Sequence, residues 1–143
     1  MKILVLHGPN LNLLGTREPG VYGKVTLAEV DRMIREHARR RGGSVECRQS
    51  NLEGQLVDWL QAAHREGFDG VVFNPGAFTH YSIALRDAVA AIKLPVVEVH
   101  LSNILEREEW RRHSVLEEVV SHRIMGKGPE GYHEALLWLM RPR

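Results

Sequence analysis

Glu98 and His100 lie two residues apart in the mostly apolar segment PVVEVHL at residues 95–101. Side chains two residues apart point to the same face of a β-strand, so a carboxylate and an imidazole are expected side by side. A neighbouring carboxylate orients an imidazole and raises its pKa, which suits a histidine for donating a proton near neutral pH. A charged pair is costly inside a sheet unless it is used or fully hydrogen-bonded, so we favour a functional pair over a structural ion pair.

A loop rich in Gly and Pro, HGPNLNLLGTREPGVYG at residues 7–23, follows the apolar segment KILVL at residues 2–6. It carries Asn10, Arg17 and Tyr22. Tyr22 is a candidate base if an arginine stabilises its phenolate, and Arg17 is on the same loop. Lowering a phenol pKa from about 10 to about 7 requires roughly 4 kcal/mol, within reach of one or two desolvated guanidinium groups. Closing the loop over a ligand would expel water and strengthen this coupling, whereas a surface aromatic is the alternative role for Tyr22.

Three other segments offer groups that can bind an anionic oxygen. The stretch NPGAFTHYS places Asn74 at the end of an apolar run and His80 near the start of a predicted helix, whose backbone N–H groups favour anions. Ser102 closely follows the carboxylate–imidazole segment, and its hydroxyl and N–H are expected to be free for a ligand. Arg107 and Arg111 are four residues apart, on one face of a predicted helical turn. An ordinary turn with a helix cap, and a solvated helix face, are the alternatives.

Composition restricts the partners of the chain. It has 19 Lys and Arg against 18 Asp and Glu, a net charge of +1, which indicates neither a nucleic-acid partner nor a membrane surface. Its single cysteine, Cys47, cannot form an internal disulfide and is expected to be a small buried side chain in a reducing compartment. The N-terminal apolar run is too short for a signal peptide or a membrane span, so we expect a cytoplasmic protein.

Sequence signatures of metal and cofactor sites are also missing. The eight histidines show no HExxH pattern and no paired Cys/His spacing, so no metal site is expected. The stretch GKGPEG at residues 126–131 matches GxGxxG, but only residues 132–143 follow it, too few for a dinucleotide-binding unit. We therefore expect a protein without a cofactor.

Strand-like and helical patterns alternate along the chain. Apolar runs predict four buried strands and a weaker fifth one, at residues 2–6, 44–49, 70–74, 95–100 and 122–126. Helices are predicted from Thr26 to Gly42, from Ser50 to Gly67, from about Thr79 to Ile92 and from Tyr132 to Met140. Capping-box spacing occurs twice, as Thr26 with Glu29 and as Ser50 with Glu53.

This alternation predicts an α/β fold, a flavodoxin-like domain over residues 1–143 with a five-stranded parallel sheet and helices on both faces. Ligands of such sheets bind beyond the carboxyl ends of the strands, where the polar residues above are found. Together they indicate proton transfer, with His100 as the acid. A signalling receiver module would need acidic residues after the first strand and an Asp ending the third, where His7 and Asn74 stand. A flavin or nucleotide module would need a phosphate loop, which GPNLNLLG does not provide.

Four stretches resemble, in order and spacing, the type II 3-dehydroquinate dehydratases of the shikimate pathway: LHGPNLNLLGTREPGVYG, RQSNLEGQLVDWL, NPGAFTHYSIALRDA and VEVHLSNILEREEWRRHS. The resemblance covers nearly the whole chain. It implies a flavodoxin-like subunit assembled as a dodecamer of trimers. It further implies elimination of water from 3-dehydroquinate to 3-dehydroshikimate, with anti geometry, through an enolate and without a cofactor.

The resemblance also implies a role for each site residue. Tyr22 would be the base, Arg17 would stabilise its phenolate and the transition state, and Asn10 would place the water or donor that meets the enolate. His100, held by Glu98, would protonate the departing hydroxyl. Arg107 would support the base, Asp87 would reach into the site of a neighbouring subunit, and the carboxylate and hydroxyls of the substrate would be bound by Asn74, His80, Leu101, Ser102 and Arg111.

Overall fold

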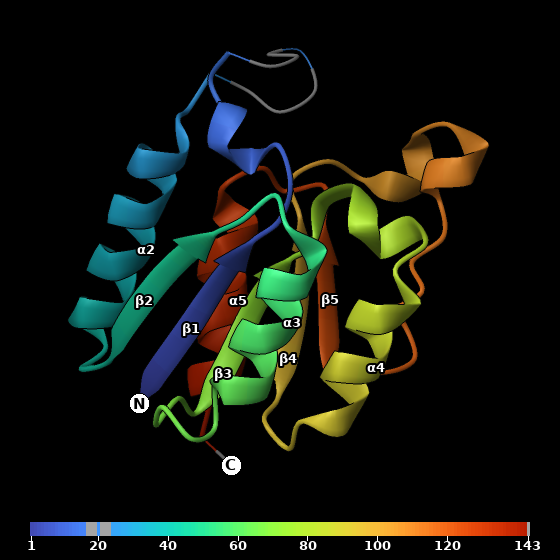
Figure 1. Cartoon of the computed structure of the whole chain (residues 1–143). Helices are drawn as coiled ribbons and strands as arrows, with labels where there is room; N and C mark the ends of the chain where they lie inside the picture. The colour runs from blue at the N-terminus through green and yellow to red at the C-terminus, as the bar shows by residue number, and fades with distance from the viewer. Residues whose placement is uncertain (17–19, 21–23, 143) are drawn as a thin grey trace.

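The computed structural model describes residues 1–16, 20 and 24–142, and within these residues five strands form one parallel sheet. The strands are β1 (Lys2–His7), β2 (Ser44–Gln49), β3 (Gly70–Asn74), β4 (Val96–His100) and β5 (His122–Met125). Their order across the sheet is β2-β1-β3-β4-β5, as Figure 1 shows. This order is that of flavodoxin-like folds and confirms the predicted fold class.

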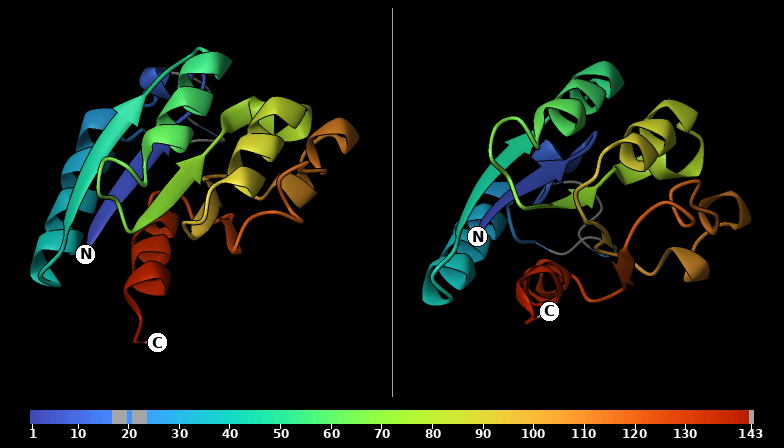
Figure 2. Two further views of the ribbon diagram at one scale, coloured as in Figure 1. Left: turned by 60° about the horizontal axis from the view of Figure 1, so that its bottom comes forward. Right: turned by 90° about the horizontal axis from the view of Figure 1, so that it is seen from below.

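Helices cover both faces of the sheet. Figure 2 shows α2 (Leu27–Arg40) and α5 (Glu130–Met140) on one face, with α3 (Glu53–Ala62) and α4 (Ile83–Ala91) on the other. Alternate residues of β1 therefore enter two separate apolar layers, Ile3 and Val5 beneath α2 and α5, and Leu4 and Leu6 beneath α3 and α4. No helix in the described part of the chain is long and apolar enough to cross a membrane.

The first predicted capping box is confirmed at the start of α2. The Glu29 backbone N–H donates to Thr26 Oγ1 at 3.2 Å, and Thr26 Oγ1 donates to Glu29 Oε1 at 3.1 Å. At the other end the chain leaves the helix through Gly42, whose φ of 74° lies in the left-handed region that glycine adopts most readily.

The second predicted capping box is wrong. The N-cap of α3 is Leu52 rather than Ser50, because the Ser50 hydroxyl accepts the Leu52 N–H at 2.9 Å and donates to Gln55 Oε1 at 2.7 Å. The Glu53 carboxylate instead accepts the Ser82 hydroxyl at 2.5 Å and so joins α3 to α4.

The predicted helix from Thr79 to Ile92 consists of two elements. A 3-10 helix, η2 (Gly76–His80), precedes α4, which begins at Ile83 behind the N-cap Ser82. The Ser82 hydroxyl accepts the Leu85 N–H at 3.0 Å. This cap defines the start of α4 and leaves Thr79 outside the helix.

Three smaller predictions need correction. Residues 44–49 do form a strand, but β2 is an edge strand and is only partly buried. The strand expected at residues 95–100 begins at Val96, and the last helix begins at Glu130 rather than Tyr132. Short 3-10 helices, η1 (Leu11–Leu13), η3 (Ile104–Glu106) and η4 (Glu109–Arg111), occupy loops at the carboxyl edge.

The close approach of β1 and β3 at Gly8 gives a test of this packing. The Gly8 N–H donates to the Asn74 carbonyl at 2.7 Å, and a Cβ at Gly8 would lie 2.5 Å from the Pro75 carbonyl oxygen. We expect Gly8→Ala to lower the free energy of unfolding, measured by urea denaturation, by about 1–3 kcal/mol through overpacking. The control is Gly54→Ala in α3, where a Cβ meets nothing within 4 Å and helix propensity predicts a gain of up to about 1 kcal/mol. Equal effects of both substitutions would contradict the packing at Gly8.

Candidate active site

Three polar residues end three neighbouring strands at the carboxyl edge of the sheet. His7 ends β1, Asn74 ends β3 and His100 ends β4, and His7 is level with Asn74 in the β1–β3 register. All three side chains are buried. This edge is where open α/β sheets bind their ligands.

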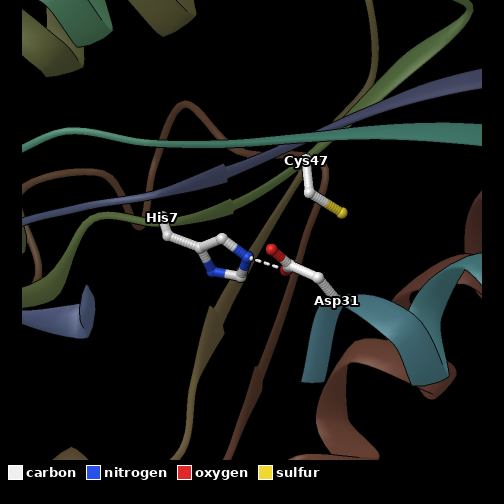
Figure 3. A group of neighbouring side chains, drawn as sticks. All are labelled: His7, Asp31 and Cys47. Carbon is white, nitrogen blue, oxygen red and sulfur yellow. Dashed lines mark hydrogen bonds and ion pairs between the residues drawn. The ribbon is translucent and has the colours of Figure 1, made fainter. Parts of the chain in front are cut away.

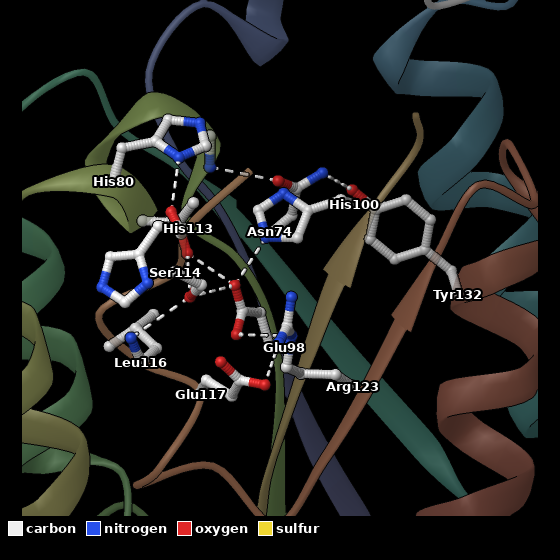
Figure 4. Close-up of polar contacts among 12 residues, drawn as sticks. Asn74, His80, Glu98, His100, His113, Ser114, Leu116, Glu117, Arg123 and Tyr132 are labelled. Carbon is white, nitrogen blue, oxygen red and sulfur yellow. Dashed lines mark hydrogen bonds and ion pairs between the residues drawn. The ribbon is translucent and has the colours of Figure 1, made fainter. Parts of the chain in front are cut away.

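Glu98 precedes His100 by two residues on β4, so its side chain is on the same face of the strand. It is fully buried, with 0% of its surface exposed. Its Oε2 atom accepts the Thr79 hydroxyl at 2.5 Å and the Ser114 hydroxyl at 2.8 Å, and lies 2.6 Å from His100 Nε2 (Figure 4). The side-by-side carboxylate and imidazole predicted from strand alternation are therefore present. The carboxylate takes hydrogen bonds from three different parts of the chain.

Arg123 on β5 adds a positive charge to this group. Its Nε atom lies 3.6 Å from Glu98 Oε1, and its Nη1 atom lies 3.0 Å from Glu117 Oε1. Burial alone raises the pKa of Glu98, but the hydrogen bonds and charge of His100 and the hydroxyls of Thr79 and Ser114 outweigh it, so the pKa lies below its ordinary value. Glu98 is therefore a carboxylate at neutral pH.

This carboxylate determines where His100 carries its protons. An ionised carboxylate only accepts, so His100 Nε2 is an N–H donor. Any proton that His100 gives to a ligand must then leave from Nδ1. The structure thus separates the two ring nitrogens into one that anchors the ring and one for proton transfer.

His80 is held as a neutral ring. Burial lowers its pKa and exceeds the opposing effect of the His113 carbonyl, and the nearby His100 and Arg111 lower it further. Its Nδ1 atom lies 2.8 Å from the His113 carbonyl oxygen, which can only accept, so Nδ1 carries the proton (Figure 4). The remaining nitrogen, Nε2, is consequently a hydrogen-bond acceptor.

Asn74 belongs to a second buried polar group. Its Oδ1 atom accepts the Gly76 N–H at 3.1 Å, and its Nδ2 atom donates to the Tyr132 hydroxyl at 3.0 Å. Because the Gly76 N–H is used by Asn74, this N–H is not available to hold an anion beside the Asn74 amide. The second N–H of Asn74 Nδ2 remains for a ligand.

Cys47 lies beside His7 and Asp31 (Figure 3). It packs against the apolar layer beneath α2 and α5, as expected of a small core side chain, but it is only partly buried. Potential metal-donor atoms of His7, Asp31 and Cys47 lie within 4.8 Å of one another, but His7 Nε2 and Asp31 Oδ1 already contact each other at 2.7 Å. Burial, together with the charge of Asp31, raises the pKa of the Cys47 thiol, which favours the protonated form rather than a thiolate ligand.

The two predicted arginines are not on one helical turn. Arg107 is the C-cap of η3 with an extended backbone, whereas Arg111 ends η4. Arg107 Nη1 donates to the Ser102 hydroxyl at 3.2 Å, so this oxygen is not free as expected. Arg111 Nε donates to a carboxylate oxygen of Glu108 at 2.6 Å. Both guanidinium groups are mostly buried at the same edge of the sheet.

The remaining predicted site residues are placed as follows. Asn10 has a left-handed backbone with φ of 69°, and its N–H donates to Asn51 Oδ1 at 2.9 Å. Leu101 is buried directly after β4. Asp87 is exposed on α4, and no hydrogen bond or ion pair of the described residues joins it to the other predicted site residues. Arg17 and Tyr22 lie outside the described residues.

Sequence reasoning missed four residues that hold this site together. Thr79 and Ser114 lie in stretches that resemble the family, but the position of a hydroxyl in the sequence does not show which group it will hydrogen-bond. Arg123 is level with Glu98 in the β4–β5 register, so that register could have identified it. Tyr132 matches the apolar face of its helix, and nothing in the sequence shows that its hydroxyl contacts His7 and Asn74.

The sheet order defines a flavodoxin-like α/β protein with a buried carboxylate–imidazole pair at the carboxyl edge of its sheet. The family model "Dehydroquinase class II" matches residues 1–140. A 3-dehydroquinate dehydratase of Pelotomaculum thermopropionicum is 61% identical over 136 residues, covering 95% of this chain and 94% of that protein. One of Deinococcus radiodurans is 54% identical over 137 residues, covering 96% of each. The crystal structure of the type II dehydroquinase from Butyrivibrio crossotus has a TM-score of 0.96 at 48% identity, covering 97% of each chain. This chain belongs to the class II dehydroquinase family.

The lowered pKa of Glu98 gives a prediction about stability. The ordinary value is 4.5, so the stabilisation by the folded-state hydrogen bonds is complete above that pH and is lost as the pH falls through the native pKa. We expect Glu98→Gln to lower the free energy of unfolding by about 1–3 kcal/mol at neutral pH, since His100 and Arg123 lose their anionic partner. Urea denaturation at about pH 7 and about pH 3 should show this difference narrowing in acid. A difference that is equal at both values would contradict an ionised Glu98.

Proposed function

We propose that this chain is a type II 3-dehydroquinate dehydratase, which removes water from 3-dehydroquinate to give 3-dehydroshikimate in the shikimate pathway. The observation that carries the proposal is the Glu98–His100 pair, 2.6 Å apart at the carboxyl edge of the sheet, in a chain that the family model matches over residues 1–140. Relatives at 61% and 54% identity bear the same enzyme name and match over almost their whole length.

The reaction requires two proton transfers. A base removes the proton alpha to the ketone, the resulting enolate is stabilised by hydrogen-bond donors, and an acid protonates the hydroxyl that leaves from the beta carbon. The product is a conjugated enone. Side chains that hold and move protons are sufficient for each of these steps.

His100 acts as the acid in this proposal. Glu98 accepts the Nε2 proton and stabilises the charged ring, so the proton for the leaving hydroxyl comes from Nδ1. Thr79 and Ser114 keep the Glu98 carboxylate in position through their hydroxyls. The acid is therefore oriented before substrate arrives, which lowers the cost of reaching the reactive geometry.

Tyr22 is the proposed base, with Arg17 stabilising its phenolate and Arg107 supporting it electrostatically. Asn10 is proposed to hold the donor that meets the enolate oxygen. These roles come from the family resemblance, and for Arg107 they are supported by a largely buried guanidinium group at the same edge.

Substrate binding is proposed for five residues at this edge: Asn74, His80, Leu101, Ser102 and Arg111. Asn74 offers an N–H and Arg111 a positive charge, both suited to the oxygens of a carboxylate. His80 offers only an acceptor at Nε2 in its neutral form, so its partner is a hydroxyl group of the substrate.

The assembly is proposed to be a dodecamer of trimers in the cytoplasm, with Asp87 reaching the site of a neighbouring subunit. Ile83 is four residues before Asp87 on α4 and is 56% exposed, and Tyr81, just before the helix, is 62% exposed. Large exposed apolar groups that lie close together are typical of subunit contacts.

The direct test is conversion of 3-dehydroquinate by the purified protein, followed by the ultraviolet absorbance of the enone. We expect activity to persist after treatment with a chelator and with borohydride, because neither a metal nor a Schiff base takes part.

His100→Ala should lower kcat by about 10²–10⁴, the range for loss of a general acid, and Tyr22→Phe should also lose most of kcat. No absorbance rise with the unaltered protein would contradict the proposed function, and near-full activity of Tyr22→Phe would remove it as the base.

Asp87 can be tested by mixing subunits. Asp87→Ala and His100→Ala should each be nearly inactive, but a site with His100 from one variant and Asp87 from the other would be complete. If the two are unfolded, mixed in equal amounts and reassembled, random pairing predicts about a quarter of the sites complete. Activity equal to the average of the two parents would contradict a role for Asp87 in a neighbouring site. Light scattering on the unaltered protein tests the size of the assembly.

A further inference from the structure

A buried chain of hydrogen bonds runs from Asn74 to Asp31 across the four elements β3, α5, β1 and α2 (Figures 3 and 4). Asn74 Nδ2 donates to the Tyr132 hydroxyl at 3.0 Å, which lies 3.1 Å from His7 Nδ1. His7 Nε2 lies 2.7 Å from Asp31 Oδ1. Tyr132 and His7 are both completely buried, whereas the Asp31 side chain is 17% exposed. The catalytic steps above do not use Tyr132, His7 or Asp31.

We propose that Tyr132, His7 and Asp31 are positioning residues that orient the Asn74 amide so that an N–H, rather than a carbonyl oxygen, meets an oxygen atom of the substrate. The inference rests on the proposed function, because it concerns the same site. Beyond that function, the inference assigns the donor and the acceptor of each hydrogen bond in the chain and names the residues that determine this direction.

The direction follows from what each group can donate. The Asp31 carboxylate only accepts, so His7 Nε2 carries a proton. Asn74 Nδ2 only donates to the Tyr132 hydroxyl, so His7 Nδ1 is the acceptor that this buried hydroxyl has for its own proton. The Tyr132 hydroxyl therefore donates its single proton to His7 and accepts from Asn74. Burial raises the pKa of Tyr132 despite the opposing bond from Asn74, so the hydroxyl keeps that proton.

The same chain excludes the flipped amide. With Asn74 reversed, its oxygen would face a hydroxyl whose proton is already given to His7, and its NH₂ would face the Gly76 N–H. Both contacts would then lack a proper donor–acceptor match, and buried mismatches cost about 1–3 kcal/mol each. Asn74 is thus anchored at Oδ1 by Gly76 and at Nδ2 by Tyr132, with one N–H left for the substrate.

Tyr132→Phe tests the first link. The ring stays in place and only the hydroxyl is lost, so the anchor at Asn74 Nδ2 disappears. We expect KM for 3-dehydroquinate to rise about tenfold while kcat changes less than about threefold, because Asn74 binds a substrate oxygen throughout the reaction rather than only in the transition state. Ser121→Ala, which removes an exposed hydroxyl just before β5 at the amino end of the sheet, is the control and should leave both constants unchanged.

A double-mutant cycle separates positioning from general damage to the fold. If Tyr132 acts through Asn74, then Tyr132→Phe should raise KM by less than about twofold once Asn74→Ala is present. An equal rise in both backgrounds would overturn the inference, as would an unchanged KM in the single variant. The two failures are distinguishable. If the unaltered protein does not turn over 3-dehydroquinate, the proposed function is wrong. If it does, but Tyr132→Phe raises KM equally with and without Asn74→Ala, only the positioning role is wrong.

Asp31 gives a second route that does not disturb the core. Asp31→Asn can still accept the His7 Nε2 proton through its amide oxygen, whereas Asp31→Ala cannot and frees the imidazole to take its other tautomer. KM should rise severalfold in Asp31→Ala and return towards the original value in Asp31→Asn. Equal KM values in the two variants would contradict the assigned proton positions.

Discussion

The carboxylate of Glu98 is a fully buried charge in the middle of a parallel sheet, and the arrangement of the active-site edge depends on satisfying it. An unpaired ion there would cost several kcal/mol. Thr79 from η2, Ser114 from the segment before β5, and His100 from its own strand donate to it, while Arg123 on β5 supplies the opposite charge. Segments that are distant in sequence are thereby held around one ring, and that ring is the proposed acid.

The two polar groups of the site differ in chemistry and in the role that we propose for each. The group around Glu98 is ionic and holds the histidine that we propose as the acid. The group around Tyr132 consists of an amide, a phenol and an imidazole that contacts Asp31, and it fixes the amide that we propose to bind the substrate. Both groups include residues at the ends of central strands, where the hydrogen-bonded sheet fixes the backbone and so keeps the side chains in a defined geometry.

Much of the fold could be predicted because its causes are local. Apolar runs gave β1 and β3, and the Thr26 hydroxyl met Glu29 within one helical turn. The second capping box failed because Glu53 is bonded to Ser82, a partner from another element. Strand alternation paired Glu98 with His100, but Tyr132 could only be assigned to an apolar face. Hydrogen bonds between distant elements leave no periodic trace in the sequence, so the supporting residues of the site required the structure.

We propose that Glu98 acts only by holding His100, so that the two residues form one acid. This claim is tested most directly by kcat for Glu98→Gln, His100→Ala and the double variant, with enone absorbance as the readout. We predict that the double variant loses no more activity than His100→Ala alone, within about twofold, since a positioning carboxylate has nothing left to hold. Losses that multiply in the double variant would contradict the account and give Glu98 a role of its own.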